Sequence, residues 1–207
     1  MRNMKETIKK HILNNKKEYI IVTLLFIIGI FLGVLFVNNI NESQETEVTD
    51  YLNNFIEKMK SIESLDNISL LKTSAIQNVF FAMILWFFGT TVIGIPVVFG
   101  IVFYRGFCFG YTISVCVAIM GISKGLLFVL INLLLPSLFI IPAILAIAVS
   151  GFKLYKSIVK DNRKENIKLE IVRHTVFSLI MLCVMIFASL IEVFISTNIL
   201  KLLIKYF

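Results

Sequence analysis

Five long apolar stretches occupy most of this chain, and they constrain its fold more than any other feature. Residues 19–37, 73–104, 106–123 and 125–152 contain no charged side chain, and residues 175–200 contain only Glu192. About 20 apolar residues in a helix cross a ~30 Å hydrocarbon layer, where the backbone has to satisfy its own hydrogen bonds. The sequence therefore predicts an all-α, polytopic membrane protein built as a helical bundle.

Composition and charge agree with a membrane location. Hydrophobic residues make up 58% of the chain and charged residues 16%, whereas soluble domains usually have about 25% charged residues. The formal net charge of +7 resides mostly in two segments that flank apolar stretches. This distribution is typical of a topology signal with some attraction to anionic lipid, not of a nucleic-acid-binding surface. We therefore expect contact with a lipid bilayer and none with nucleic acid.

The basic segments also predict the orientation of the chain. Lysine and arginine outnumber the acids in residues 1–18 and 153–173, whereas the acids are in excess in residues 38–74. The positive-inside rule then places the two basic segments in the cytoplasm and the acidic segment outside. Roughly 80 residues connect the acidic segment to the second basic one, enough for three crossings. We expect five spans in total, with a C-terminal tail outside.

Single charges indicate where the spans end. Arg105 is expected at a cytoplasmic turn and Lys124 at an outer turn, because each interrupts a long uncharged stretch. The expected segments, in chain order, are a basic cytoplasmic N-terminus 1–18, a first span 19–37, an outer loop 38–74, a second span 75–104, a third span 106–123, a fourth span 125–152, a basic cytoplasmic loop 153–173, a fifth span 175–200 and an outer tail 201–207.

Proline and glycine predict irregular helices. The expected second span is longer than one crossing needs, and Gly94 and Pro96 lie within it. Proline removes a backbone donor and crowds the preceding turn, so we expect a kink near Pro96. A bent span and a re-entrant piece at residues 94–104 both fit the extra length. Pro136 and Pro142 predict further kinks in the fourth span. The kinks have two alternative explanations at this point, packing geometry and a functional hinge.

Small residues predict where the helices touch. In lipid, helices associate through the close backbone approach that small side chains permit. Two spans carry such residues four positions apart, and these residues are Gly106, Gly110, Ser114 and Ala118 in the third span and Gly29 and Gly33 in the first. We expect them to mark helix packing, with the third span as a central element. The pattern does not separate contacts within the chain from those of a homo-oligomer.

The outer loop contains an amphipathic pattern. Its apolar residues follow spacings of four and three, which places them on one stripe of a short helix: Val48, Leu52, Phe55, Met59 and Ile62. One interpretation is a helix that lies on the membrane or on top of the bundle. The other is a candidate partner surface that docks an extracytoplasmic protein. Both interpretations are open at this point.

Recognisable catalytic chemistry is absent from the sequence. The two histidines, His11 and His174, lie beside basic segments, and the three cysteines lie within spans. No nucleophile elbow, phosphate loop or HExxH motif occurs, and no spacing suggests a disulfide framework or a metal site. We therefore expect a protein that is not an enzyme, with no catalytic, cofactor-binding or metal-binding residues.

Glu192 is the only carboxylate within the expected spans. Ionisable residues inside a membrane often mark function. Glu192, however, lies only about two to three helical turns before Lys201. A position near the outer interface, in contact with water or a polar neighbour, is the favoured interpretation. A proton or ion pathway would need several polar groups along the bundle, so the role of Glu192 is open.

The middle of the chain carries the most specific pattern of residues. It contains, in order, Asn78, Trp86-Phe87-Phe88-Gly89, Ile93-Gly94-Ile95-Pro96 and Arg105-Gly106-Phe107-Cys108-Phe109-Gly110, and later Leu135-Pro136 and Ile140-Ile141-Pro142-Ala143. With the basic N-terminus, the acidic outer loop and the five spans, this pattern resembles the stage II sporulation protein M family of spore-forming bacteria. The family tends to have Gln-Asn after the first of the later prolines, where this chain has Ser137-Leu138. A role for those two polar side chains therefore does not carry over.

The resemblance implies a protein of the mother-cell membrane at the engulfing septum, needed for engulfment of the forespore. Members are described as assembling with stage II sporulation proteins D and P, whose peptidoglycan-degrading domains lie outside the membrane. The expected function is a non-catalytic scaffold that recruits or anchors these septal peptidoglycan hydrolases. The alternative is a transport or channel component, because broken helices often line substrate sites. A membrane enzyme that acts on lipid is a weaker third interpretation.

Overall fold

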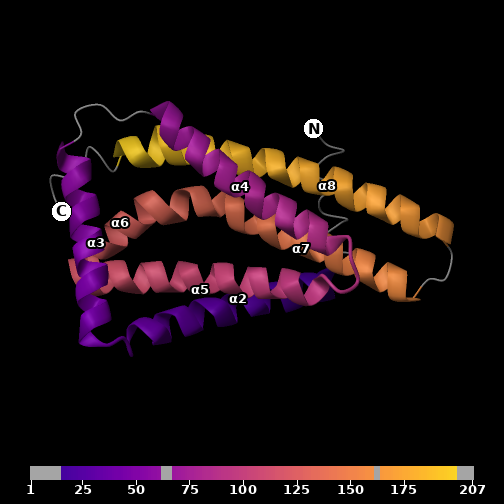
Figure 1. Ribbon diagram of the computed structural model, residues 1–207, viewed down its shortest axis with the longest axis horizontal. Helices are drawn as coiled ribbons and strands as arrows, with labels where there is room; N and C mark the ends of the chain where they lie inside the picture. The colour runs from indigo at the N-terminus through magenta and orange to yellow at the C-terminus, as the bar shows by residue number, and fades with distance from the viewer. Residues whose placement is uncertain (1–14, 62–66, 161–163, 200–207) are drawn as a thin grey trace.

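The helices of this chain follow its apolar stretches. The computed structural model describes residues 15–61, 67–160 and 164–199 (Figure 1). Its elements are α2 Lys16–Val37, α3 Glu42–Ser61, α4 Asn67–Gly89, α5 Ile95–Met120, α6 Ile122–Val129, the π-helix η1 Leu130–Leu134, α7 Leu135–Lys160, α8 Lys164–Ile191 and the π-helix η2 Glu192–Ser196. These residues contain no strand, and five of their helical segments are long and apolar enough to cross a membrane. The predicted all-α bundle of five spans is therefore confirmed.

The spans run back and forth between two ends of the bundle. α2 begins at the end where α4 is joined to α5 and α7 to α8, whereas α3 crosses the opposite end (Figure 1). We call these the basic end and the α3 end. At the basic end, the Lys156 Nζ atom lies 2.8 Å from Glu18 Oε1 and joins α7 to α2. The positive-inside rule predicts that the basic end faces the cytoplasm, and this orientation stays a prediction.

The turn between the second and third spans lies at residues 90–94. α4 ends at Gly89 and α5 begins at Ile95, so the predicted boundary at Arg105 is wrong. The alternative of a re-entrant piece at residues 94–104, which the sequence left open, is excluded because residues 95–104 belong to α5. Pro96 does not kink a span. It lies in the first turn of α5. Backbone N–H groups in a first turn have no acceptor within the helix, so the missing N–H of proline costs no hydrogen bond there. Gly94 is the N-cap residue of the same helix.

Arg105 lies well inside α5. It is about 15 Å from the start of a helix that is about 39 Å long, at 1.5 Å per residue. The expectation that Arg105 marks a cytoplasmic turn fails because its side chain lines a cavity inside the bundle. A charge that faces the interior does not have to end a membrane helix. Lys124, by contrast, is exposed in α6, directly after the turn at Gly121 at the α3 end.

Two prolines make the fourth span irregular. α6, η1 and α7 form one continuous helical segment, Ile122–Val159, whose path bends where α6 passes into α7 (Figure 1). Pro136 cannot donate to the carbonyl of Asn132, and Asn132 lies in the middle of η1. The wider π turn makes room for the proline ring at this position. Pro142 lies inside α7.

α7 is the central helix of the bundle. It contacts α2, α4, α5 and α8. Its buried residues Ile147, Ala148 and Val149 belong to the main core, together with Leu85 of α4 and Met185 of α8. The sequence pattern pointed to the third span as a central element, but that helix packs mainly on α2. The fourth span is the central one because it has neighbours on all sides.

The glycines of α2 and α5 face each other. A Cβ atom at Gly29 would overlap the carbonyl of Phe103, and one at Gly33 would overlap that of Phe107. On α5, Gly106 and Gly110 lie in the same way against α2. The two backbones approach so closely that only glycine fits at these four positions, and the contact lies within one chain. Farther along α5, Ser114 is half-buried and Ala118 is exposed.

α3 lies across one end of the bundle with its apolar side inward. Leu52 and Ile56 are buried in a cluster with Phe128 and Val129, and the rings of Phe55 and Phe128 meet edge-on at 6.3 Å. The predicted amphipathic helix is therefore present, and it takes the position on top of the bundle. Leu52 and Phe55 of the predicted stripe are therefore not a free partner surface, because they pack against the bundle.

The stripe is only partly described. Val48 is half-buried, the side chain of Met59 is not described, and Ile62 lies outside the described residues.

Candidate functional site

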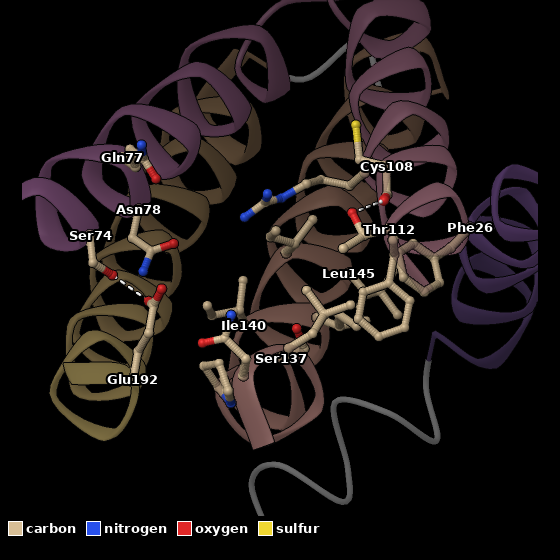
Figure 2. Close-up of a pocket in the computed structure, with 17 residues that line it drawn as sticks. Phe26, Ser74, Gln77, Asn78, Cys108, Thr112, Ser137, Ile140, Leu145 and Glu192 are labelled. Carbon is tan, nitrogen blue, oxygen red and sulfur yellow. Dashed lines mark hydrogen bonds between the residues drawn. The ribbon is translucent and has the colours of Figure 1, made fainter. Parts of the chain in front are cut away.

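A polar cavity lies inside the bundle, between α4 and α5 and beside α7. Its volume is about 200 Å³. Its walls come from α2, α4, α5, η1, α7 and η2, and the polar or charged side chains that give it its character are Ser74, Gln77, Arg105, Asn132, Ser137 and Glu192. In Figure 2, Ser74, Gln77 and Glu192 lie across the cavity from Cys108 and Thr112. That these polar groups meet at one place was not predicted from the sequence.

α4 presents a polar face to the cavity and to α8. Ser74, Gln77 and Asn78 are three and four residues apart, so they share one side of an otherwise apolar helix. The Ser74 hydroxyl donates to Glu192 Oε2 at 2.5 Å. Asn78 is buried, and its Nδ2 donates to Ser189 Oγ at 2.8 Å and to the Met185 carbonyl at 3.3 Å. These bonds join α4 to the last turns of the fifth span.

Glu192 faces the cavity. It is the first residue of η2, and the Thr197 hydroxyl donates to its backbone carbonyl at 2.9 Å. Its carboxylate is half-buried and accepts the hydrogen bond from Ser74. The favoured interpretation from sequence included a polar neighbour, and that neighbour is Ser74.

Arg105 enters the cavity from α5. Its guanidinium lies over the Phe81 ring, 4.3 Å from the ring centroid. Among the described residues, no carboxylate lies within 4.0 Å of it, although Glu192 is near enough to attract it electrostatically. A cation–π contact of this kind contributes about 0.5–2 kcal/mol and leaves the five N–H donors free for other partners.

Both π-helices border the cavity. Asn132 and Leu133 of η1 and Glu192 of η2 line it, and the two π-helices contact each other. A π turn shifts the side chains that follow it around the helix axis, and such turns are frequent at functional sites. The irregular backbone of the fourth and fifth spans is therefore concentrated at this cavity.

The cavity has the chemistry of a binding site. It sets a cation and an anion in one partly open space, together with hydroxyl and amide groups. Within the described part of the chain, no group of three or more His, Cys, Asp or Glu side chains could hold a metal ion. Cys108 lines the cavity, but among the described residues it forms no hydrogen bond with a histidine or a carboxylate that could act as its base.

The comparison with protein families agrees with the middle block of the sequence. The model of the Stage II sporulation protein M family matches residues 22–197, which include the cavity and the five apolar helical segments in whole or in part. This chain belongs to the stage II sporulation protein M family. It is a sporulation-related membrane protein. No curated protein and no solved structure matches the chain.

In this member of the stage II sporulation protein M family, the Trp86…Gly89 motif has a packing role. The Trp86 indole donates to Thr175 Oγ1 at 3.0 Å. Gly89 lies beside the ring of His174 and against Gly151 of α7. A Cβ atom at position 89 would come within 2.8 Å of His174 Nε2. The motif thus closes the basic end of the bundle, away from the cavity.

His174 is buried, although its sequence neighbours are basic. Its Nδ1 lies 3.0 Å from Ser150 Oγ, which joins α8 to α7. The sequence placed His174 only beside a cytoplasmic segment. Gly89 of α4 leaves space for the imidazole ring, because a Cβ atom at this position would meet it.

Within the apolar spans, a few polar residues have a helical spacing that could have indicated the cavity. Arg105, Cys108 and Thr112 are three and four residues apart, so they lie on one side of α5. Ser74 and Asn78 repeat the same spacing on α4. Polar residues on one face of a membrane helix indicate an interior side. The pairing of these two faces, however, appears only in the folded bundle.

Proposed function

We propose that this member of the stage II sporulation protein M family is a non-catalytic membrane scaffold. It recruits or anchors peptidoglycan-degrading proteins at the septum while the forespore is engulfed. Family membership supports a role in sporulation, and the family resemblance names stage II sporulation proteins D and P as the partners. In this proposal the α3 end faces outward from the mother-cell membrane, on the side where a wall-degrading domain works.

The observation that carries the proposal is the way α3 is held. Its buried side fastens it across the end of the bundle, so its opposite side is presented as a fixed surface. That side carries Glu47, Asp50 and Glu57, which are all exposed. Tyr51, on its flank, is 76% exposed. Exposed tyrosines are frequent anchors in protein interfaces, and a row of acids favours a partner with a basic surface.

Charge reversal on α3 tests the proposal. The double variant Asp50→Lys, Glu57→Lys changes two exposed residues, so it leaves the core intact. We expect normal accumulation in the membrane, but at least about tenfold lower recovery of stage II sporulation proteins D and P with the tagged protein from sporulating cells.

The matched control is Lys124→Glu, which reverses an exposed charge on α6 at the same end of the bundle. It should leave partner recovery unchanged. Undiminished recovery with the α3 double variant would contradict the acidic face as the docking surface. Absence of both partners from complexes of the wild-type protein would contradict the scaffold function as a whole.

The alternative is a transport or channel component, and the polar cavity is the observation that favours it. Arg105→Gln separates the two functions, because Arg105 lies inside the bundle and not on α3. If the protein is a scaffold, the Arg105→Gln variant should still recover its partners. If it is a transporter, the same variant should lose solute movement in proteoliposomes.

A further inference from the structure

We propose that the cavity between α4 and α5 binds a small zwitterion, with its anionic group at Arg105 and its ammonium group at Glu192. This inference goes beyond the scaffold function and does not rest on it. The cavity lies inside the bundle, whereas the proposed docking surface is the outer side of α3. The two can therefore be tested separately.

Arg105 provides the site for an anion. A guanidinium has five N–H donors and keeps its charge in a protein. Beyond the Phe81 ring, no described side chain forms a hydrogen bond or an ion pair with it. An unpaired charge inside a membrane is costly, so a guanidinium that lines this cavity needs water or an anionic group there. A carboxylate or a phosphate fits its forked geometry.

Glu192 provides the site for a cation. One of its oxygens, Oε2, accepts from Ser74, and no described residue forms a hydrogen bond or an ion pair with the other. The carboxylate and the Arg105 guanidinium attract each other but are more than 4.0 Å apart. A ligand that carries both charges can bridge this separation and neutralise both groups. An ion of one sign would satisfy only one of them.

The volume of the cavity limits the size of the ligand. One water molecule occupies about 30 Å³, so about 200 Å³ holds six or seven waters. A ligand in their place has a similar number of non-hydrogen atoms. Alanine and serine are zwitterions of this size. Gln77, Asn132 and Ser137 add uncharged donors and acceptors around it.

The depth of the cavity favours a free solute over a lipid headgroup. Arg105 lies about 15 Å from the nearer end of α5, whereas headgroups lie at the membrane surface. Phosphatidylethanolamine nevertheless has the same pair of charges, a phosphate and an ammonium group. The experiment therefore includes both sources of the zwitterion.

The first measurement is calorimetric titration of the purified full-length protein with alanine and with serine. The comparison ligands are alaninamide, which lacks the anionic group, and N-acetylalanine, which lacks the ammonium group. We expect alanine and serine to bind. The affinity for each comparison ligand should be lower by a factor of about ten or more. Equal binding of the three alanine compounds would overturn the proposal.

Variants identify the two charges. Arg105→Gln and Glu192→Gln should each weaken zwitterion binding about tenfold or more, whereas the exposed control Lys124→Gln should not change it. If Arg105→Gln fails to fold, the comparison of ligands on the wild-type protein still decides the question. Binding that survives either cavity variant would overturn the proposal.

The lipid source is tested in nanodiscs by native mass spectrometry. Retention of phosphatidylethanolamine over phosphatidylglycerol, lost in the same two variants, would support the zwitterion site and assign it to a headgroup. If neither alanine, serine nor phosphatidylethanolamine binds, the proposal is wrong. Partner recovery, the readout of the scaffold function, is independent of this result.

Discussion

Asn78 shows how much a single polar residue can contribute inside this bundle. Its amide nitrogen donates to Ser189 and to the Met185 carbonyl, and these are the buried hydrogen bonds that join α4 to α8 near the cavity. Ser74 of α4 donates a further interhelical hydrogen bond to Glu192 of η2, which follows α8 in the fifth span. Because helices in lipid gain little from burying apolar surface, directional bonds of this kind set how the helices are aligned.

We expect Asn78→Ala to destabilise the bundle by roughly 0.6–2 kcal/mol, because interhelical hydrogen bonds in membranes have about this strength. Thermal unfolding of the purified protein in detergent measures the loss. Gln77→Ala is the matched control, since this neighbouring amide is exposed on the same helix. An Asn78→Ala variant as stable as the control would show that the two hydrogen bonds are not needed.

The pair of helices α2 and α5 is the most closely packed element of the fold. Glycines on both helices allow backbone-to-backbone contact, and the pair forms one side of the cavity through Phe26 and Arg105. α4 and η2 form the other side through Ser74 and Glu192. The cavity persists between them because α7, with η1 and Pro136, holds the two pairs apart in this half of the bundle.

Alanine scanning of the glycines tests this contact. Gly110→Ala places a Cβ atom against the backbone of Ile30, and we expect a loss of about 1–3 kcal/mol. Gly100→Ala is the control on the same helix, because nothing lies within 4 Å of its added Cβ atom. Replacing a helical glycine in open space should stabilise α5 by about 0.5–1 kcal/mol. Thermal unfolding compares the stability of Gly110→Ala with that of Gly100→Ala. Equal effects of the two substitutions on stability would argue against the close contact.

The whole molecule is polarised along its length. The acidic helix α3 lies across one end, and the ion pairs of Lys156 with Glu18 and of Arg173 with Glu170 lie toward the other. The anionic headgroups of the cytoplasmic leaflet favour lysine and arginine on that side. The proposed scaffold function depends on this polarity, because it requires that α3 face the wall.

Cysteine labelling from outside the cell tests the orientation. In a background without the three native cysteines, we expect an impermeant maleimide to modify Asn53→Cys on α3. Lys168→Cys on α8 is the control, since it is also exposed but lies at the basic end. It should react only after the membrane is opened. The opposite pattern of labelling would reverse the topology and contradict the proposed docking surface.

The sequence by itself determined that the long apolar stretches of this chain are helices, but not that α7 and α8 extend into residues 153–173, which were expected to be a loop. Uncharged stretches long enough to cross a bilayer have to form helices there, and glycines four residues apart have to lie on one face. The amphipathic period of α3 follows in the same way from its residues. Where this reasoning went wrong, at Arg105, a charge was taken as the end of a span, whereas Gly94 and Pro96 marked the turn.

Only the tertiary structure decided which helix faces meet. Ser74 and Glu192 are 118 residues apart, and no local pattern states that one will donate to the other. Arg105 is tolerated within a span because residues from six elements form a cavity with polar groups around it. The apolar stripe of α3 could have met lipid, a partner or the bundle, and packing against Phe128 settled the choice. Periodicity describes one helix at a time, whereas a cavity depends on the relative position of several.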